Sequence, residues 1–205
     1  MTRFRLNWRV PVLAGGFLLG LLATLPLRVA VDWVGLGERG LSASEVRGSV
    51  WSGALDGARL GGVALGDVAA RLSALPLLVG EARLDLERRD DGFAGAFTAS
   101  RHAGGVEDVS GSLTGAVLAG LPGATLGFED FGARFRDGLC DHAEGRVTAV
   151  WMSASFSGEP RCEGAQLRLP LASGRSRIDL SISADGSYRA DVAMPPYSGR
   201  IAGAF

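Results

Sequence analysis

The chain contains no lysine, and all of its 21 basic residues are arginine. Arginine carries a planar fork of donors that suits bidentate binding of anions, but a genome rich in G and C explains the same usage more simply. The formal net charge is −1, and no segment concentrates positive charge. Binding to nucleic acid requires such a concentration at the phosphates. We therefore expect no nucleic-acid partner.

The sequence also shows no set of residues with the pattern of a catalytic site. Only two histidines occur, His102 and His142, and both lie in polar, glycine-rich surroundings. A nucleophile needs a base and a group that orients this base, and no serine is tied to either histidine. The carboxylate pairs at 90–91 and 129–130 are poor acid–base pairs, because neighbours on a strand point to opposite faces and Asp-Asp-Gly is typical of a turn. We expect no enzymatic activity, no catalytic residue and no cofactor.

The chain has a single long hydrophobic run, at residues 10–27, and three arginines precede it. Residues 29–31 can lengthen this run to about 20 residues, the length of a membrane-spanning helix. The positive-inside rule places the basic side in the cytoplasm. We therefore predict a cytoplasmic N-terminus at 1–9, a single-pass anchor at 10–31 in the bacterial inner membrane, and a linker at 32–43.

A cleaved signal peptide is the alternative to a retained anchor. Such a peptide has an apolar region of about 7–15 residues and ends in small residues spaced A-x-A. The chain fits that pattern poorly around Pro26. Trp8 and Trp33 flank the run, where indoles favour the two membrane interfaces, which favours the spanning helix.

The remaining residues, 44–205, are predicted to form one β-rich periplasmic domain. The composition, 47% hydrophobic and 21% charged, is that of a folded chain. Apolar and polar residues alternate at 82–87, 166–171 and 177–183, which indicates strands with one dry face. Asp185-Gly186 lies between two such segments and predicts a hairpin turn. The fold class is thus mainly β: a transmembrane helix, then an antiparallel, strongly twisted meander.

Two shorter features interrupt the alternation. Residues 73–79 and 114–121 carry weak helical signals, so we expect one or two short helices. Residues 46–53 and 109–115 share an order of apolar residue, polar residue, Gly, Ser, apolar residue and Gly, and a poorer copy starts at 144. A glycine early in each copy predicts a bulge or a close approach of two backbones.

Four further residues are candidates for structural or contact roles. Cys140 and Cys162 both follow the anchor, in the compartment assigned to the oxidising periplasm, and predict a disulfide. Metal binding is the alternative, with His142 as the nearest additional ligand. Trp51 is a core residue or a partner contact near the membrane exit. Within the anchor, Gly16 and Gly20 form a small-xxx-small motif that allows helix packing.

With these features in place, the chain resembles the type II secretion system protein N family. The anchor with its Leu-Pro exit, the block at 46–53 and the C-terminal block carry the resemblance. That last block joins the Gly-Leu-Cys at 138–140 to residues 156–164 and to the strands that run on to Tyr188. Residues 94–106 show nothing that resembles the family.

Membership implies a non-catalytic accessory subunit of the machine that passes folded periplasmic proteins through an outer-membrane secretin. Its partners would be other secretion subunits, in the inner-membrane platform or the secretin, and no metal or cofactor is implied. A different class has a similar plan. AsmA-like lipid-bridge proteins also place an open sheet after one anchor, and their apolar face holds phospholipid. A one-sided sheet must cover its dry face with something, so this alternative stays open.

Overall fold

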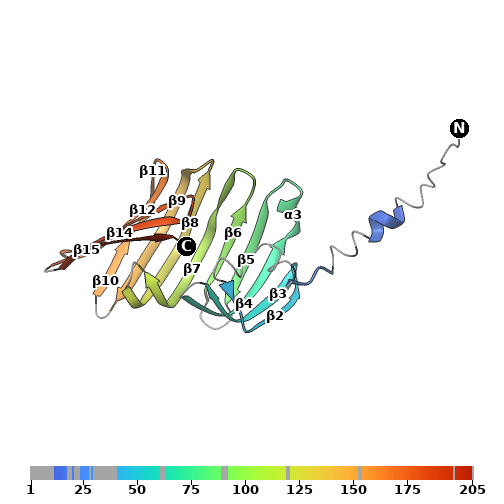
Figure 1. Cartoon of the computed structure of the whole chain (residues 1–205), viewed down its shortest axis with the longest axis horizontal. Coiled ribbons are helices and arrows are strands. Elements are labelled where there is room, and N and C mark those ends of the chain that lie inside the picture. Colours follow the sequence, from blue (N-terminus) through green and yellow to red (C-terminus); the bar gives the residue numbers. More distant parts are fainter. Residues whose placement is uncertain are drawn as a thin grey trace.

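The computed structural model describes residues 12–17, 20, 24–27, 29, 41–60, 63–88, 92–118, 121–151, 154–195 and 197–204. Almost all of these belong to strands (Figure 1). In chain order the elements are β1 (Leu41–Ser42), β2 (Glu45–Ser49), β3 (Ser52–Leu60), β4 (Val63–Ser73), α3 (Ala74–Leu77), β5 (Ala82–Arg88), β6 (Ala94–Ala99), β7 (Ala103–Leu118), β8 (Leu121–Arg136), β9 (Leu139–Trp151), β10 (Ala154–Gly158), β11 (Arg161–Glu163), β12 (Gln166–Ser173), β13 (Ser176–Ser183), β14 (Ser187–Met194) and β15 (Tyr197–Ala204).

The described strands form one antiparallel sheet of 15 strands, in which neighbours along the chain are usually neighbours in the sheet. β2 and β11 lie off the main path and pair with β3 and β12. The prediction of a mainly-β antiparallel meander is confirmed. The three alternating segments are β5, β12 and β13, and Asp185-Gly186 is the turn between β13 and β14, where Gly186 has a φ of 82°.

Two hydrophobic cores lie along the sheet. The C-terminal core is formed by residues of β9, β10, β12, β13 and β14: Val147, Ala149, Phe156, Leu169, Leu171, Ile178, Leu180 and Ala190. The N-terminal core joins β3 and β4 to the chain before the sheet and to the turn after β2: Leu27, Val50, Leu55, Ala58, Val68 and Ala70.

The sheet covers its own dry face at the C-terminal end. Phe156 and Leu171 are 0% exposed, although no described helix packs on this core. Figure 1 shows β14 and β15 running across the direction of β5–β9, so that the last strands turn back on the long ones. Burial of such large side chains contributes roughly 2–3 kcal/mol each, which favours this curled arrangement over a flat sheet.

Arg88 braces the other half of the sheet, where the short strands β5 and β6 end. Its guanidinium donates to the carbonyl of Leu65 on β4 at 3.2 Å and to the carbonyl of Ser112 on β7. The guanidinium also lies 5.5 Å from the centre of the Phe93 ring. Arg88 is 8% exposed, and these contacts satisfy a charge that would otherwise be costly to bury.

The expectation of one or two short helices is met by one helix among the described residues after the anchor. Residues 74–77 form α3. At the second weak helical signal, residues 114–118 continue β7 instead, and β8 begins at Leu121. β7 and β8 pair along nearly their whole length, out to Leu118↔Leu121. This ladder outweighs the local helical signal, because eight residues containing two glycines are too short to form a stable helix alone.

The three repeated glycines behave as predicted. Gly48, Gly111 and Gly145 have φ values of 84°, 109° and 87°. A Cβ at each position would lie 2.5 Å from Ser52 O, 2.6 Å from Phe93 Cα or 2.3 Å from Asp130 O. Only glycine combines this backbone conformation with such a close approach.

Ten of the 22 residues of the predicted anchor lie outside the described residues, as do Trp8, Trp33 and residues 32–40 of the linker. Residues 12–17 are helical, and the first strand, β1, begins at Leu41. Among the described residues, none of the helices is both long enough and apolar enough to span a membrane. Leu27 is 7% exposed and belongs to the N-terminal core, and Pro26 forms an isolated bridge with Ser49.

Candidate interaction surfaces

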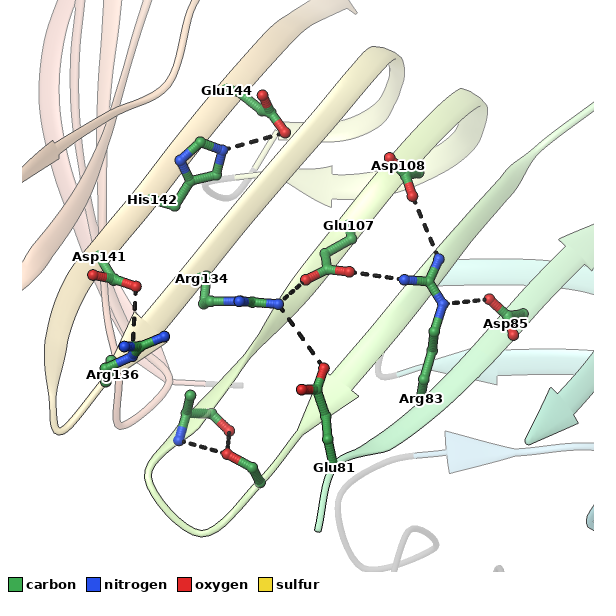
Figure 2. A network of polar contacts seen from close by, with 12 residues as sticks. Glu81, Arg83, Asp85, Glu107, Asp108, Arg134, Arg136, Asp141, His142 and Glu144 are labelled. Atoms are coloured by element: carbon green, nitrogen blue, oxygen red, sulfur yellow. Dashed lines mark hydrogen bonds and ion pairs between the residues drawn. The ribbon is translucent and has the colours of Figure 1, made fainter. Parts of the chain in front are cut away.

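A network of charged side chains crosses the polar face in the middle of the sheet (Figure 2). Glu107 on β7 accepts from Arg83 on β5 at 2.9 Å and from Arg134 on β8. Arg83 also contacts Asp85 at 2.9 Å and Asp108 at 3.4 Å. We call Arg83, Asp85, Glu107, Asp108 and Arg134 the central network.

Small residues on the intervening strand make this network possible. Arg83 pairs with Thr98 on β6, and Thr98 pairs with Gly105 on β7. Ala96, opposite Glu107, is 2% exposed and Thr98 is 6% exposed. Since neither side chain rises far from the sheet, the guanidinium of Arg83 extends over β6 to reach Glu107, and in doing so it helps to cover both residues.

The network favours the charged form of Arg83. The hydrogen bond with Asp85 is the main cause of the raised pKa of Arg83, and partial burial opposes it. The Arg134 guanidinium lies between Glu107 and, at 3.9 Å, Glu81. The carboxylates outnumber the guanidinium groups here, so this part of the polar face carries a net negative charge.

Further ion pairs of charged side chains lie around β9, between the end of β8 and the residue after β10. Ion pairs join Arg136 to Asp141 at 3.6 Å, and Arg146 to Glu159 at 3.0 Å. These side chains are about half exposed or more. Exposed pairs contribute little to stability, so these two do little to hold the fold.

Each of the two histidines lies beside a carboxylate and is exposed to solvent. His102 Nδ1 lies 3.1 Å from Asp137, and His142 Nε2 lies 3.2 Å from Glu144. Their side chains are 77% and 56% exposed. Of the two carboxylate pairs that were considered for acid–base chemistry, 90–91 lies outside the described residues, whereas Glu129 approaches Arg146 at 3.8 Å and Asp130 contacts Ser110.

The predicted disulfide is present. Cys140 at the start of β9 is bonded to Cys162 on β11, with their Cα atoms 5.2 Å apart. Cys140 N also donates to Gly164 O at 3.0 Å. Because each sulfur is bonded to the other, neither is available to a metal with His142. No cluster of three or more His, Cys, Asp or Glu side chains that could hold a metal occurs in the described ranges.

Trp51 lies in the turn between β2 and β3 rather than within a strand. It is half-buried and packs against the N-terminal core. Of the two roles expected for Trp51, that of a core residue agrees with this packing. The contact with a partner stays a prediction. Among the described residues, no side chain or distant backbone atom lies within 4 Å of a Cβ built at Gly16 or Gly20, and the helix packing expected of them stays a prediction.

The apolar face is left partly open between the two cores. Phe97 on β6 lies on this face, paired with Leu84 and Val106 on the neighbouring strands. It is 45% exposed. The outer edge of β15 is open too: among the described strands, β15 pairs only with β14, from Ser187↔Ala204 to Met194↔Tyr197.

The model of the type II secretion system protein N family matches residues 39–200. The chain belongs to this family. The match runs from just before β1 to the middle of β15 and includes residues 94–106, which had shown no resemblance by motif. No curated protein and no solved structure matches the chain. Membership in the protein N family ties the chain to type II secretion.

Sequence reasoning missed the central network and the openness of the apolar face at Phe97. The alternation at 82–87 placed Arg83 and Asp85 on one face. Glu107 could not be placed, because irregularities in β7 between Val106 and Gly111 break its period of two. The order of β5, β6, β7 and β8 in the sheet brings the charged residues of the network together. This order is a property of the whole sheet, and no local motif encodes it.

Proposed function

We propose that this protein N family member is a non-catalytic accessory subunit of the type II secretion machinery. The apolar segment at 10–31 anchors it in the bacterial inner membrane, and the β domain lies in the periplasm and contacts other subunits of the platform or the secretin. The observation that carries the contact is the open outer edge of β15, which pairs with β14 alone among the described strands. Such an edge offers a row of backbone donors and acceptors to a strand of a partner.

The composition of β15 supports strand addition. Edges that avoid pairing carry several charges, an internal proline or a bulge. β15 has eight residues, Tyr197–Ala204, with no proline and with Arg200 as its one charged residue. Arg200 contacts Asp191 on β14, and this ion pair directs its charge along the polar face of the sheet rather than outward from the edge.

Three features support the location. Three arginines precede the apolar segment, which favours a cytoplasmic N-terminus. The Cys140–Cys162 bond is suited to an oxidising compartment such as the periplasm. The docking of Leu27 onto the N-terminal core places the end of the apolar segment directly against the β domain.

Two proline substitutions at adjacent positions test the open edge. Successive residues of a strand direct their backbone groups to opposite sides, so one of Ser198→Pro and Gly199→Pro removes an outward donor and the other removes a donor to β14. The melting temperature identifies which is which, because the inward variant loses a ladder hydrogen bond. We expect the outward variant to fold normally and yet to fail to restore secretion in a strain that lacks the protein. Full secretion with that variant would contradict a role for the β15 edge.

The exposed Phe97 on the apolar face favours a second candidate, an AsmA-like role in binding phospholipid. An apolar face without a cover is a place for acyl chains. This candidate expects phospholipid to co-purify with the protein and Phe97→Glu to abolish its retention. The strand-addition proposal expects Phe97→Glu to secrete normally, so the two are distinguished by the same variant.

A further inference from the structure

The connection between β4 and β5 carries an unusual concentration of exposed apolar side chains. Leu75, Leu78 and Val79 are 80%, 83% and 83% exposed, and Leu77 is 39% exposed. We call residues 74–80 the apolar tip. The sequence from Leu72 to Gly80 contains no charged residue, and the nearest charges are Arg71 and Glu81. Single exposed leucines are ordinary, but adjacent ones mark a surface that meets another apolar phase.

Several backbone donors of the apolar tip are paired within it. Leu78 N donates to Leu75 O, Val79 N to Pro76 O, and Gly80 N to Leu77 O, each at 3.1 Å. Glu81 N donates to Pro76 O at 3.0 Å. Paired donors lower the cost of bringing this backbone to the surface of a bilayer, where water still reaches the remaining polar groups.

A short chain of hydrogen bonds links the apolar tip to the end of the N-terminal apolar segment. Val50 N donates to Leu25 O at 3.1 Å, and Leu72 N donates to Val50 O at 3.0 Å. Leu27 and Val50 are buried in the N-terminal core, and Leu25 and Leu72 pack against it. The apolar tip begins two residues after Leu72, so it lies at the same corner of the sheet as the exit of that segment.

We propose that the apolar tip inserts into the surface of the lipid bilayer that holds the N-terminal segment. This inference rests on the retained anchor of the proposed function. Within the anchor proposed at 10–31, Leu25 and Leu27 dock onto the N-terminal core, so the fifteen positions 10–24 are left to cross the bilayer. A helix of fifteen residues measures about 22 Å, less than the roughly 30 Å of a hydrocarbon core. Because the anchor is that short, the corner of the sheet with Leu25, Val50 and Leu72 must lie at the surface of the bilayer. The exposed leucines of the apolar tip are then transferred from water into lipid.

Attachment at two points has a consequence for the rest of the sheet. A domain held by one linker rotates freely above the membrane, whereas a domain held by the anchor and the apolar tip keeps one orientation. The contact surfaces on the later strands, β15 among them, are then presented to neighbouring subunits from a fixed direction.

Photo-crosslinking in the full-length protein tests the inference. A photoreactive residue is placed at Leu78, at Leu13 in the N-terminal helix as positive control, and at Arg175 in the exposed turn after β12 as negative control. The protein is reconstituted in vesicles of phosphatidylethanolamine and phosphatidylglycerol, and adducts are identified by mass spectrometry. We expect phospholipid adducts at positions 78 and 13 and none at 175.

The possible failures are distinguishable. Lipid adducts at 13 without any at 78, or with equal yield at 175, overturn the insertion of the apolar tip and leave the anchor in place. The absence of lipid adducts at 13 overturns the anchor of the proposed function and this inference with it. As a second variant, Leu78→Ser with Val79→Ser should lower the lipid adducts from a probe at Leu75 by at least about tenfold, since each large side chain favours lipid by about that factor or more. The melting temperature should not change, because both side chains are exposed; an unchanged adduct yield contradicts the inference.

Discussion

Arg83 on β5 passes over β6 and places its Nη1 atom 2.9 Å from Glu107 Oε2 on β7. The contact depends on the small side chains of Ala96 and Thr98 beneath it, both of which are buried. One interaction therefore bridges three strands at the centre of the polar face. Arg134 on β8 extends the same contact to a fourth strand.

A double-mutant cycle should measure this coupling. Arg83→Ala and Glu107→Ala together are expected to show an interaction energy of about 1 kcal/mol in urea unfolding, at the upper end for partly exposed pairs. The side chains of Arg83 and Glu107 are only 30% and 25% exposed. As control, Arg136→Ala with Asp141→Ala should couple by less than about 0.5 kcal/mol, because those side chains are 56% and 44% exposed. Equal couplings for the two pairs would contradict the account.

The disulfide is expected to be structural. Replacing Cys140 and Cys162 by serine should lower the free energy of unfolding by about 3 kcal/mol. This is the contribution expected from the entropy of closing a loop of this size, since the two cysteines are 22 residues apart. The melting temperature should fall by about 10 °C in a chain of this length. A melting temperature that does not change on reduction of the native protein would rule out this role.

The glycine of the third repeat should be intolerant of a side chain. Gly145→Ala places a Cβ 2.3 Å from Asp130 O at a φ of 87°, and we expect a loss of about 3 kcal/mol or more from the clash and the left-handed backbone together. Gly174→Ala is the matched control. Gly174 has a φ of 58° and nothing within 4 Å, so its substitution should cost about 1 kcal/mol. Thermal unfolding of the two variants makes the comparison, and similar losses would show that the close approach at Gly145 is unimportant.

The β13–β14 turn should have a measurable pH signature. Asp185 Oδ1 accepts hydrogen bonds from Ser187 Oγ at 2.7 Å and from Ser187 N at 2.9 Å, and these bonds lower the pKa of the carboxyl. A carboxyl with a lowered folded-state pKa stabilises the fold at neutral pH, and this contribution is lost as the pH falls through that pKa. NMR titration should find Asp185 below the ordinary range for aspartate, and Ser187→Ala should raise its pKa. A Ser187→Ala titration identical to that of the native protein would contradict the assigned cause.

The sequence predicted the elements best where the pattern was local. Alternation identified β5, β12 and β13, and Asp-Gly identified the turn after β13. The repeated glycines predicted close backbone approaches at Gly48, Gly111 and Gly145. Each of these signals depends on the conformation of a few adjacent residues, so sequence alone was sufficient.

What depended on distant pairing could not be predicted. The weak helical signal at 114–121 was overridden by the long ladder between β7 and β8. The contact of Glu107 with Arg83 and Arg134 requires the register of β5–β8. The apolar tip was identified as a short helix, but its exposure was not, because a hydrophobic run gives no sign of whether another element covers it.

In-cell photo-crosslinking from the edge of β15 tests the central claim most directly. Probes are placed at Ser198 and Gly199, both exposed, and at Arg175 as a control away from the edge, and every adduct is identified by mass spectrometry. The account predicts adducts to another type II secretion subunit at one or both edge positions and none at Arg175. Phospholipid adducts alone, or no adducts at all from the edge, would contradict the claim that this sheet joins the secretion machinery by its open strand.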